Sequence, residues 1–181
     1  MEHLSKLIRD IPNFPKEGIL FKDITPLFSS AENITLTRIA LVNSIVEHFK
    51  NPNDIQVIVG VESRGFLFGV GIAESLLCSF ALARKPGKLP YEKISKSYDL
   101  EYGSTTVEMH TDSIKPGDKV IIHDDLLATG GTALATAELV KELGGEVVGF
   151  SFIVELEFLN GANAIKEKLG DDIKVISVLK Y

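Results

Sequence analysis

The sequence predicts an α/β fold in which a central, mainly parallel sheet is flanked by helices. Two observations carry this prediction. Short runs of apolar and β-branched residues, such as IQVIVGV at 55–61, recur along the chain, and stretches of helical length separate them. Strands that alternate with helices are typical of a parallel sheet covered on both faces. At 181 residues, the chain is expected to form a single domain over residues 1–181.

The first half of the chain is expected to contain three helices and two strands. Glu2–Asp10 places Leu4, Leu7 and Ile8 on one helical face, and IPNFPKEG then breaks the chain. The next helix is amphipathic and ends at NPND, and the strand after it is rich in β-branched residues. These later elements are a helix over Ala31–Lys50, a strand over Ile55–Val61, a helix over Gly65–Leu77 and a strand over Ser79–Ala83.

The second half begins with a basic loop, RKPGKLP at 84–90, and then departs from the strand–helix alternation. Ser95–Glu101 and Thr105–His110 alternate in polarity on either side of a Tyr-Gly-Ser turn, which predicts a hairpin that could cover a site. The alternation then resumes, with a helix stopped by Gly144-Gly145. The expected elements are a strand over Lys119–His123, a helix over Thr132–Leu143, a strand over Val147–Glu155, a helix over Ala162–Leu169 and a strand over Lys174–Leu179.

Composition excludes several classes of protein. The net charge of −6 disfavours a non-specific partner such as nucleic acid or an anionic membrane. The N-terminus does not read as a signal peptide, and no apolar run is long enough for a membrane span. A single cysteine fits the reducing cytoplasm. The four histidines are scattered without metal-ligand spacing.

The stretch VIIHDDLLATGGT combines two carboxylates with a glycine-rich turn that opens a helix. Converging backbone N–H groups and the helix N-terminus, which carries about half a positive charge, form a cradle for a phosphate. Carboxylates would repel that phosphate but suit the vicinal hydroxyls of a ribose, so the stretch predicts a site for a ribose 5-phosphate. A tight turn whose aspartates cap the helix is the alternative. The residues of the predicted site are Asp124, Asp125, Ala128, Thr129, Gly130, Gly131 and Thr132, with Thr132 as the expected N-cap.

This stretch resembles the fingerprint of the type I phosphoribosyltransferases, in which it binds phosphoribosyl pyrophosphate. FPKEGILFKDITPLF, VESRGFLFG, RKPGKLP and YDLEYG also occur in the order found in the adenine-specific members of that family. The resemblance implies a hood formed by the N-terminal segment, a β-hairpin lid and a homodimer. It also implies that the chain transfers a phosphoribosyl group to adenine, with Mg²⁺ arriving on the substrate and no metal bound directly by the protein.

The resemblance extends to individual site residues. The pyrophosphate would meet two loops, and the Glu62–Ser63 peptide bond could be cis. The matching pyrophosphate residues are Ser63, Arg64, Arg84, Lys85 and Lys88. Phe21 would stack on adenine, while backbone groups of Leu20 and Lys22 read the edge of the base. Glu101 would act with Arg64 in catalysis, and Tyr102 would belong to the lid.

The sequence is compatible with alternatives on three points. Another purine, such as xanthine or hypoxanthine, could replace adenine as the acceptor. The chain could also be a regulator that binds phosphoribosyl pyrophosphate without catalysis. His123, where the family usually has an aliphatic residue, could add positive charge beside the phosphate or be a packing substitution.

Overall fold

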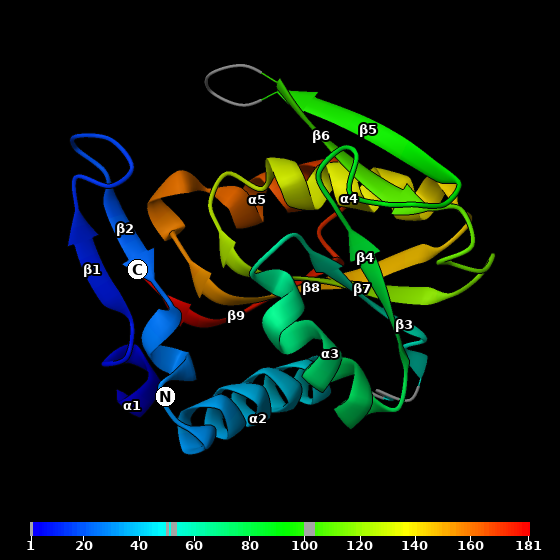
Figure 1. Cartoon of the computed structure of the whole chain (residues 1–181). Helices are drawn as coiled ribbons and strands as arrows, with labels where there is room; N and C mark the ends of the chain where they lie inside the picture. Colours follow the sequence, from blue (N-terminus) through cyan, green and yellow to red (C-terminus); the bar gives the residue numbers. More distant parts are fainter. Residues whose placement is uncertain (1, 50, 52–53, 100–103) are drawn as a thin grey trace.

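A five-stranded parallel sheet forms the centre of the computed structural model, which describes residues 2–49, 51, 54–99 and 104–181 (Figure 1). The strand order across the sheet is β4-β3-β7-β8-β9. This confirms the predicted α/β fold with its mainly parallel sheet. The five strands are β3 (Val57–Val61), β4 (Ser79–Ala83), β7 (Lys119–Leu127), β8 (Glu146–Glu155) and β9 (Lys174–Lys180).

Helices cover both faces of this sheet, and each face has its own apolar core (Figure 1). One core joins the sheet to α2 and α3 through side chains such as Leu41 and Phe68. The other joins it to α4 and α5 through side chains such as Leu139 and Ile165. The four helices are α2 (Ala31–His48), α3 (Gly65–Leu76), α4 (Gly131–Glu142) and α5 (Gly161–Leu169). No helix of the described residues is both long and apolar enough to cross a membrane.

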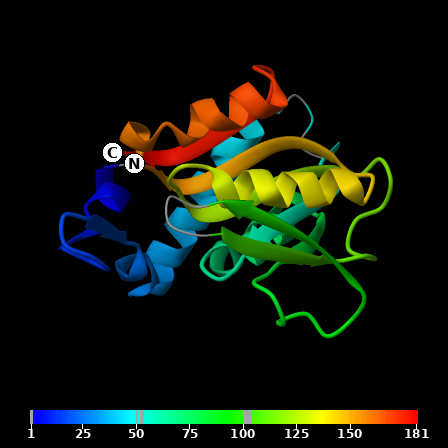
Figure 2. The same ribbon diagram turned by 90° about the horizontal axis from the view of Figure 1, so that it is seen from above.

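The antiparallel hairpin lies outside the main sheet, beyond α4, as Figures 1 and 2 show from two directions. It consists of β5 (Lys93–Asp99) and β6 (Ser104–His110). Val107 and Met109 anchor it in the core that contains α4. The predicted hairpin is therefore present, and its turn residues, which include Glu101 and Tyr102, lie outside the described part of the chain.

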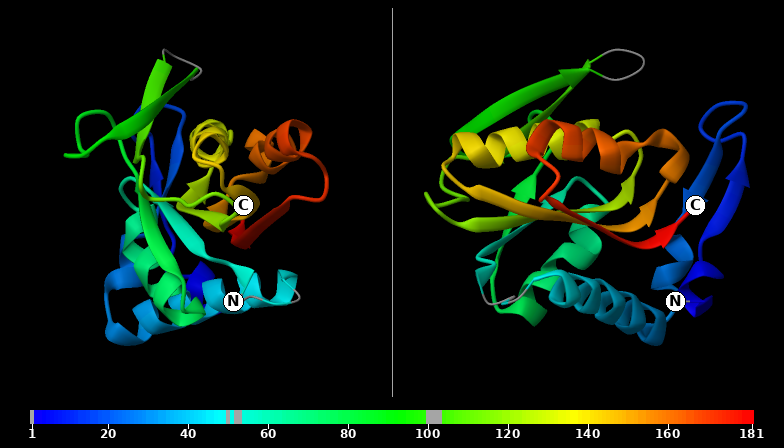
Figure 3. Two further views of the ribbon diagram at one scale, coloured as in Figure 1. Left: turned by 90° about the vertical axis from the view of Figure 1, so that its right-hand side faces the viewer. Right: turned by 180° about the vertical axis from the view of Figure 1, so that it is seen from behind.

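The N-terminal segment differs from its prediction. The helix α1 covers only Glu2–Ser5, and β1 (Arg9–Pro12) follows it where the periodicity had indicated a helix up to Asp10. β1 pairs antiparallel with β2 (Leu20–Asp23) in a small sheet of their own, and the 3₁₀ helix η1 (Thr25–Phe28) leads into α2. This small sheet stands beside the end of β9, as the rear view in Figure 3 shows. We call residues 9–23 the hood.

Candidate active site

The strand order reverses direction between β3 and β7. β3 connects through α3 to β4 on one side, whereas β7 connects through α4 to β8 on the other. In an open α/β sheet, ligands bind outside the carboxyl ends of the strands at such a switch point. β3 ends at Val61, directly before Glu62-Ser63-Arg64, and β7 carries the acidic pair towards its own carboxyl end. The topology therefore brings the basic and acidic motifs of the sequence together.

The acidic pair lies within β7, because the strand continues through Asp124 and Asp125 to Leu127 instead of ending at His123 as predicted. Successive strand residues usually point to opposite faces, but here both carboxylates line the same cavity. The backbone amide of Asp125 donates to Asp124 Oδ1 at 2.8 Å. Burial and the neighbouring charge of Asp125 raise the pKa of the Asp124 carboxyl well above its ordinary value. The pair therefore concentrates acidic groups at one point of the sheet edge, which suits hydroxyl donors of a ligand.

Arg64 compensates part of this charge. Its Nε lies 2.7 Å from Oδ2 of the buried Asp125 side chain, while its own side chain stays 42% exposed and so within reach of a ligand. Gly65 makes this approach possible, because a Cβ at that position would lie 2.6 Å from the carbonyl oxygen of His123. The peptide bond between Glu62 and Ser63 is cis, as the resemblance implied.

Two adjoining cavities hold most of the predicted phosphate-binding residues. A cavity of about 350 Å³ is lined by Glu62, Ser63, Arg64, Lys85, Asp124 and Asp125. A second, of about 160 Å³, is lined by residues 126–133 together with Asp124 and Phe152. Asp124 lines both cavities, so the two cavities meet at the acidic pair.

The second cavity is the predicted phosphate cradle. α4 begins at Gly131, and Gly130 is its N-cap, with a φ of 87°. The expectation that Thr132 is the N-cap is therefore wrong, because the chain turns into the helix two residues earlier. Within the described part of the chain, the amides of Thr129, Gly130 and Gly131 donate to no other backbone group. They remain available to an anion at the helix N-terminus.

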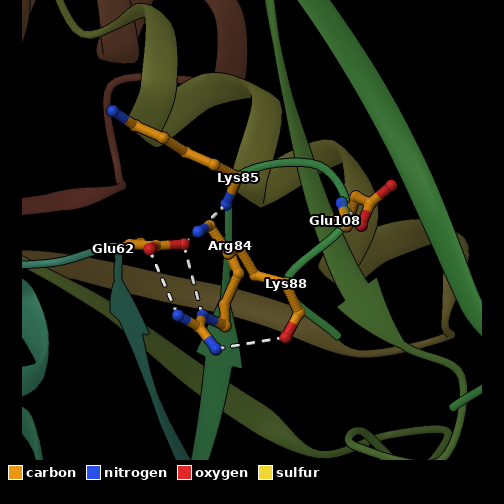
Figure 4. A network of polar contacts seen from close by, with 6 residues as sticks. Glu62, Arg84, Lys85, Lys88 and Glu108 are labelled. Atoms are coloured by element: carbon orange, nitrogen blue, oxygen red, sulfur yellow. Dashed lines mark hydrogen bonds and ion pairs between the residues drawn. The ribbon is translucent and has the colours of Figure 1, made fainter. Parts of the chain in front are cut away.

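The basic loop after β4 contributes unequally to the larger cavity. Lys85 lines it, but Arg84 and Lys88 are not among its lining residues. The Arg84 guanidinium instead binds the carboxylate of Glu62, with both contacts at 3.2 Å. Figure 4 shows this pair, with the Lys85 side chain extending away from it.

The hood approaches the site through Phe21. The Arg64 guanidinium lies 5.4 Å from the Phe21 ring centroid, and Phe14 packs against Phe21 edge-on at 5.1 Å. The Lys22 ammonium is held by Asp10 at 2.7 Å and by the ring of Tyr181 at 4.0 Å, so its side chain has a structural role. Leu20 is 48% exposed at the end of the same short strand.

His123 does not add charge to the site. It is fully buried, and burial lowers its pKa to about 4, so the ring is neutral near neutral pH. Its Nδ1 lies 3.0 Å from the carbonyl oxygen of Ser151 on the neighbouring strand. Of the two interpretations, the structure supports the packing substitution.

Two carboxylates of this region, Glu62 and Glu108, could not be recognised as important from the sequence. Both hold the basic loop in place through side-chain contacts. Glu62 directly precedes a predicted site residue, which is a weak signal. Glu108 has no such signal in the sequence, because an acidic residue in a hairpin is usually solvated.

Comparisons with known proteins identify the class. Residues 31–179 match the family model described as a phosphoribosyl transferase domain. The chain therefore belongs to the phosphoribosyltransferase family. It is similar to a relative from Flavobacterium johnsoniae named adenine phosphoribosyltransferase, with 54% identity over 91% of this chain and 94% of the relative. A relative of the same name from Syntrophotalea carbinolica is 50% identical over the full length of both chains.

A solved structure extends the likeness to the fold. Adenine phosphoribosyltransferase from Saccharomyces cerevisiae, in complex with an imino-altritol bisphosphate and adenine, superposes with a TM-score of 0.88. The two chains are 39% identical, and the match covers 98% of this chain and 97% of the yeast chain. The type I phosphoribosyltransferase fold implied by the resemblance is thereby confirmed.

Proposed function

We propose that this chain transfers the 5-phosphoribosyl group from phosphoribosyl pyrophosphate to adenine, which yields AMP and pyrophosphate. One observation carries the proposal: at the switch point of the sheet, Asp124 lies between a cavity lined by Arg64 and Lys85 and a second cavity at the N-terminus of α4. A ribose with phosphate at one end and pyrophosphate at the other matches that order of charges. The names of the relatives support adenine as the acceptor base.

Each part of the substrate has a proposed set of ligands. The amides and hydroxyls of residues 128–132 hold the 5-phosphate, and Asp124 and Asp125 accept hydrogen bonds from the ribose hydroxyls. Ser63, Arg64 and Lys85, which line the larger cavity, face the pyrophosphate, whereas Lys88, expected there from the sequence, lies outside that lining. As this group departs with its negative charge, Arg64 stabilises the charge that develops on it. The ion pair with Asp125 holds the Arg64 guanidinium beside the ribose site beforehand.

The hood supplies the proposed base site. Phe21 stacks on adenine, and the backbone of Leu20 and Lys22 reads its edge. A backbone carbonyl accepts a hydrogen bond from the 6-amino group of adenine but opposes the 6-oxo group of hypoxanthine. An unpaired buried acceptor costs about 1–3 kcal/mol, which favours adenine. Glu101 and Tyr102, outside the described residues, complete the proposal as the group that handles the purine proton and as a lid residue that excludes water.

Magnesium belongs to the proposal as a partner of the substrate. In the described residues, no group of three or more His, Cys, Asp or Glu side chains is arranged to hold a metal ion. Asp124 and Asp125 fit the looser role of contacting water bound to an ion that the pyrophosphate carries. Bound there, Mg²⁺ would neutralise charge on the leaving group.

We further propose a homodimer in the cytoplasm. Apolar side chains on the outer surfaces of α2 and α3 are exposed and suit a second copy of the chain: Leu36, Ile39, Leu67 and Val70. The lone cysteine, Cys78, fits a reducing compartment. Analytical ultracentrifugation tests the dimer, and a monomer at micromolar concentration would contradict it.

The deciding experiment is a base-specificity assay. The purified protein is given phosphoribosyl pyrophosphate with adenine, hypoxanthine, guanine or xanthine, and pyrophosphate release is measured with and without Mg²⁺. We expect turnover with adenine and Mg²⁺ and at most a few per cent of it with the other bases. Preferred turnover of a 6-oxopurine would reassign the base. Binding of phosphoribosyl pyrophosphate without turnover of any purine would indicate a regulator.

A further inference from the structure

The basic loop of residues 84–88 is held from two sides by carboxylates (Figure 4). On one side, Glu62 accepts two hydrogen bonds from Arg84, through Nε and Nη2 at 3.2 Å each. It also accepts a hydrogen bond from the backbone amide of Lys85 at 2.8 Å. Glu62 follows β3 and precedes the cis peptide bond, so this fork connects the loop at 62–64 to the loop at 84–88.

On the other side, Glu108 of β6 holds the middle of the same loop. Its Oε2 accepts a hydrogen bond from the backbone amide of Gly87 at 3.0 Å and lies 3.0 Å from the Lys93 ammonium. The backbones of Arg84 and Glu108 also exchange two hydrogen bonds, at 2.9 and 2.7 Å. The loop is therefore fixed at both its start and its centre.

These contacts engage every nitrogen of the Arg84 guanidinium, although Nη1 and Nη2 each keep a second N–H group. Nε and Nη2 bind Glu62, Nη1 donates to the carbonyl oxygen of Lys88 at 3.1 Å, and the Phe66 ring centroid lies 5.8 Å from Cζ. All three guanidinium nitrogens thus have protein partners. Although burial opposes ionisation of Glu62, the hydrogen bonds from Arg84 and from the Lys85 amide lower its pKa, so the pair is charged at neutral pH.

Lys85 has the opposite arrangement. Its backbone amide is bound to Glu62, while its side chain extends away from the Glu62–Arg84 pair (Figure 4) and lines the larger cavity with Ser63 and Arg64. In the described part of the chain, no hydrogen bond or ion pair involves its ammonium group. A cation that faces an anion site without a partner is available to the ligand.

We infer that Arg84 is a positioning residue rather than a pyrophosphate ligand, and that its fork with Glu62 aims Lys85 at the pyrophosphate. This inference rests on the proposed function. It replaces the sequence-based expectation that Arg84 itself contacts the pyrophosphate. An arginine is suited to this work because its planar guanidinium binds a carboxylate in a fixed bidentate geometry, which a lysine cannot reproduce.

Glu62→Gln separates the two roles by the sign of its effect. If Arg84 were a ligand, removing a competing negative charge beside a polyanion would leave the KM for pyrophosphate unchanged or lower it. If Arg84 positions Lys85, the weakened fork should raise that KM roughly 10-fold, because small misplacements of binding groups are costly. The measurement is the reverse reaction of AMP with pyrophosphate, and the KM for AMP should change less than 2-fold.

A double-mutant cycle between Arg84 and Lys85 gives a second test. Arg84→Met and Lys85→Met should each raise the KM for pyrophosphate. The KM of the double variant should not exceed the higher of the two single-variant values. Arg84→Lys should behave like Arg84→Met. If Arg84 and Lys85 bound pyrophosphate independently, the two fold-changes in KM would instead multiply in the double variant. Arg84→Lys would then keep much of the affinity for pyrophosphate. Glu157→Gln, which removes an ion pair with Lys180 at 3.3 Å, is the matched control and should leave every KM unchanged.

The outcomes distinguish this inference from the proposed function. A wild-type protein that turns over no purine would remove the proposed function. An active wild-type protein in which Glu62→Gln binds pyrophosphate as well as or better than wild type would overturn only the inference, as would multiplied effects in the Arg84–Lys85 cycle. Thermal unfolding of each variant checks that the fold is retained, and Arg84→Lys keeps the test available if Arg84→Met does not fold.

Discussion

Replacing Gly65 by alanine tests how closely α3 must approach β7 for the site to form. The added Cβ would lie 2.6 Å from the His123 carbonyl oxygen and 3.1 Å from Asp124 Oδ1. Ordinary contact begins near 3.4 Å, so the difference between 3.4 and 2.6 Å requires the helix start to withdraw by about 0.8 Å. The shortest contact is to the backbone of β7, which cannot turn aside as a side chain could, so the helix has to move.

This withdrawal acts directly on the adjacent Arg64. Its contact with Asp125, now 2.7 Å, would lengthen to about 3.5 Å, beyond hydrogen-bonding distance. A displacement near 1 Å in a positioned group can cost about 100-fold in rate, so we expect kcat/KM for phosphoribosyl pyrophosphate to fall about 100-fold. Overpacking costs about 1–3 kcal/mol of unfolding free energy, or roughly 2–4 °C of Tm for each kcal/mol.

Gly71→Ala on the same helix is the matched control. There the new methyl meets only the Arg38 side chain, with Cδ at 2.8 Å, and that flexible chain can move aside. Alanine within a helix favours folding by about 0.5–1 kcal/mol over glycine, so this variant should be as active as wild type and slightly more stable. Steady-state kinetics and thermal unfolding measure both variants. Wild-type kcat/KM in Gly65→Ala, or an equal loss in Gly71→Ala, would refute the reasoning.

Three further predictions concern the base, the cradle and the acidic pair. Phe21→Ala should raise the KM for adenine about 5- to 150-fold, because stacking on a base contributes about 1–3 kcal/mol; an unchanged KM would remove Phe21 from the base site. Gly130→Ala and Gly18→Ala both force a side chain into left-handed backbone, with φ of 87° and 85°, and each should lose about 1–2 kcal/mol of stability. Only Gly130→Ala should also raise the KM for phosphoribosyl pyrophosphate, and a similar rise in Gly18→Ala would show that backbone strain alone is responsible. Burial and Asp125 raise the pKa of Asp124 in the folded protein, so its contribution to stability is complete below the ordinary carboxyl pKa and is lost as the pH rises towards the raised value. Asp124→Asn should remove this decline, measured as the free energy of urea unfolding while the pH rises above the ordinary carboxyl pKa, and an unchanged slope would show that Asp124 is not its source.

The central sheet could be predicted because its strands are apolar on both faces and bounded by turn residues. Ile55–Val61 and Lys174–Leu179 were within two residues of the strands observed. β7 was cut short at His123 because two carboxylates look like the end of a strand. In the structure, Asp124 pairs with Phe152 and Leu126 with Val154, because backbone pairing depends on the neighbouring strand and not on side-chain polarity.

The hood and the basic loop show what a local pattern cannot contain. Leu4, Leu7 and Ile8 do have helical spacing, but Arg9–Pro12 gains more by pairing with Leu20–Asp23 across a turn. The position of Arg84 likewise depends on Glu62, 22 residues earlier in the chain. A cation in a glycine-containing loop looks like an anion ligand when the carboxylate that binds it cannot be recognised from spacing.

The hood has a consequence for how base choice can change. Its two strands form a separate sheet, and the family model begins only at residue 31, after the hood has ended. The machinery for the phosphorylated sugar and the hood, to which we assign the base site, are thus distinct modules joined by a short connection. Mutations could retune which heterocycle is accepted while the inherited sugar chemistry stays intact, so new specificities can evolve without rebuilding the catalyst.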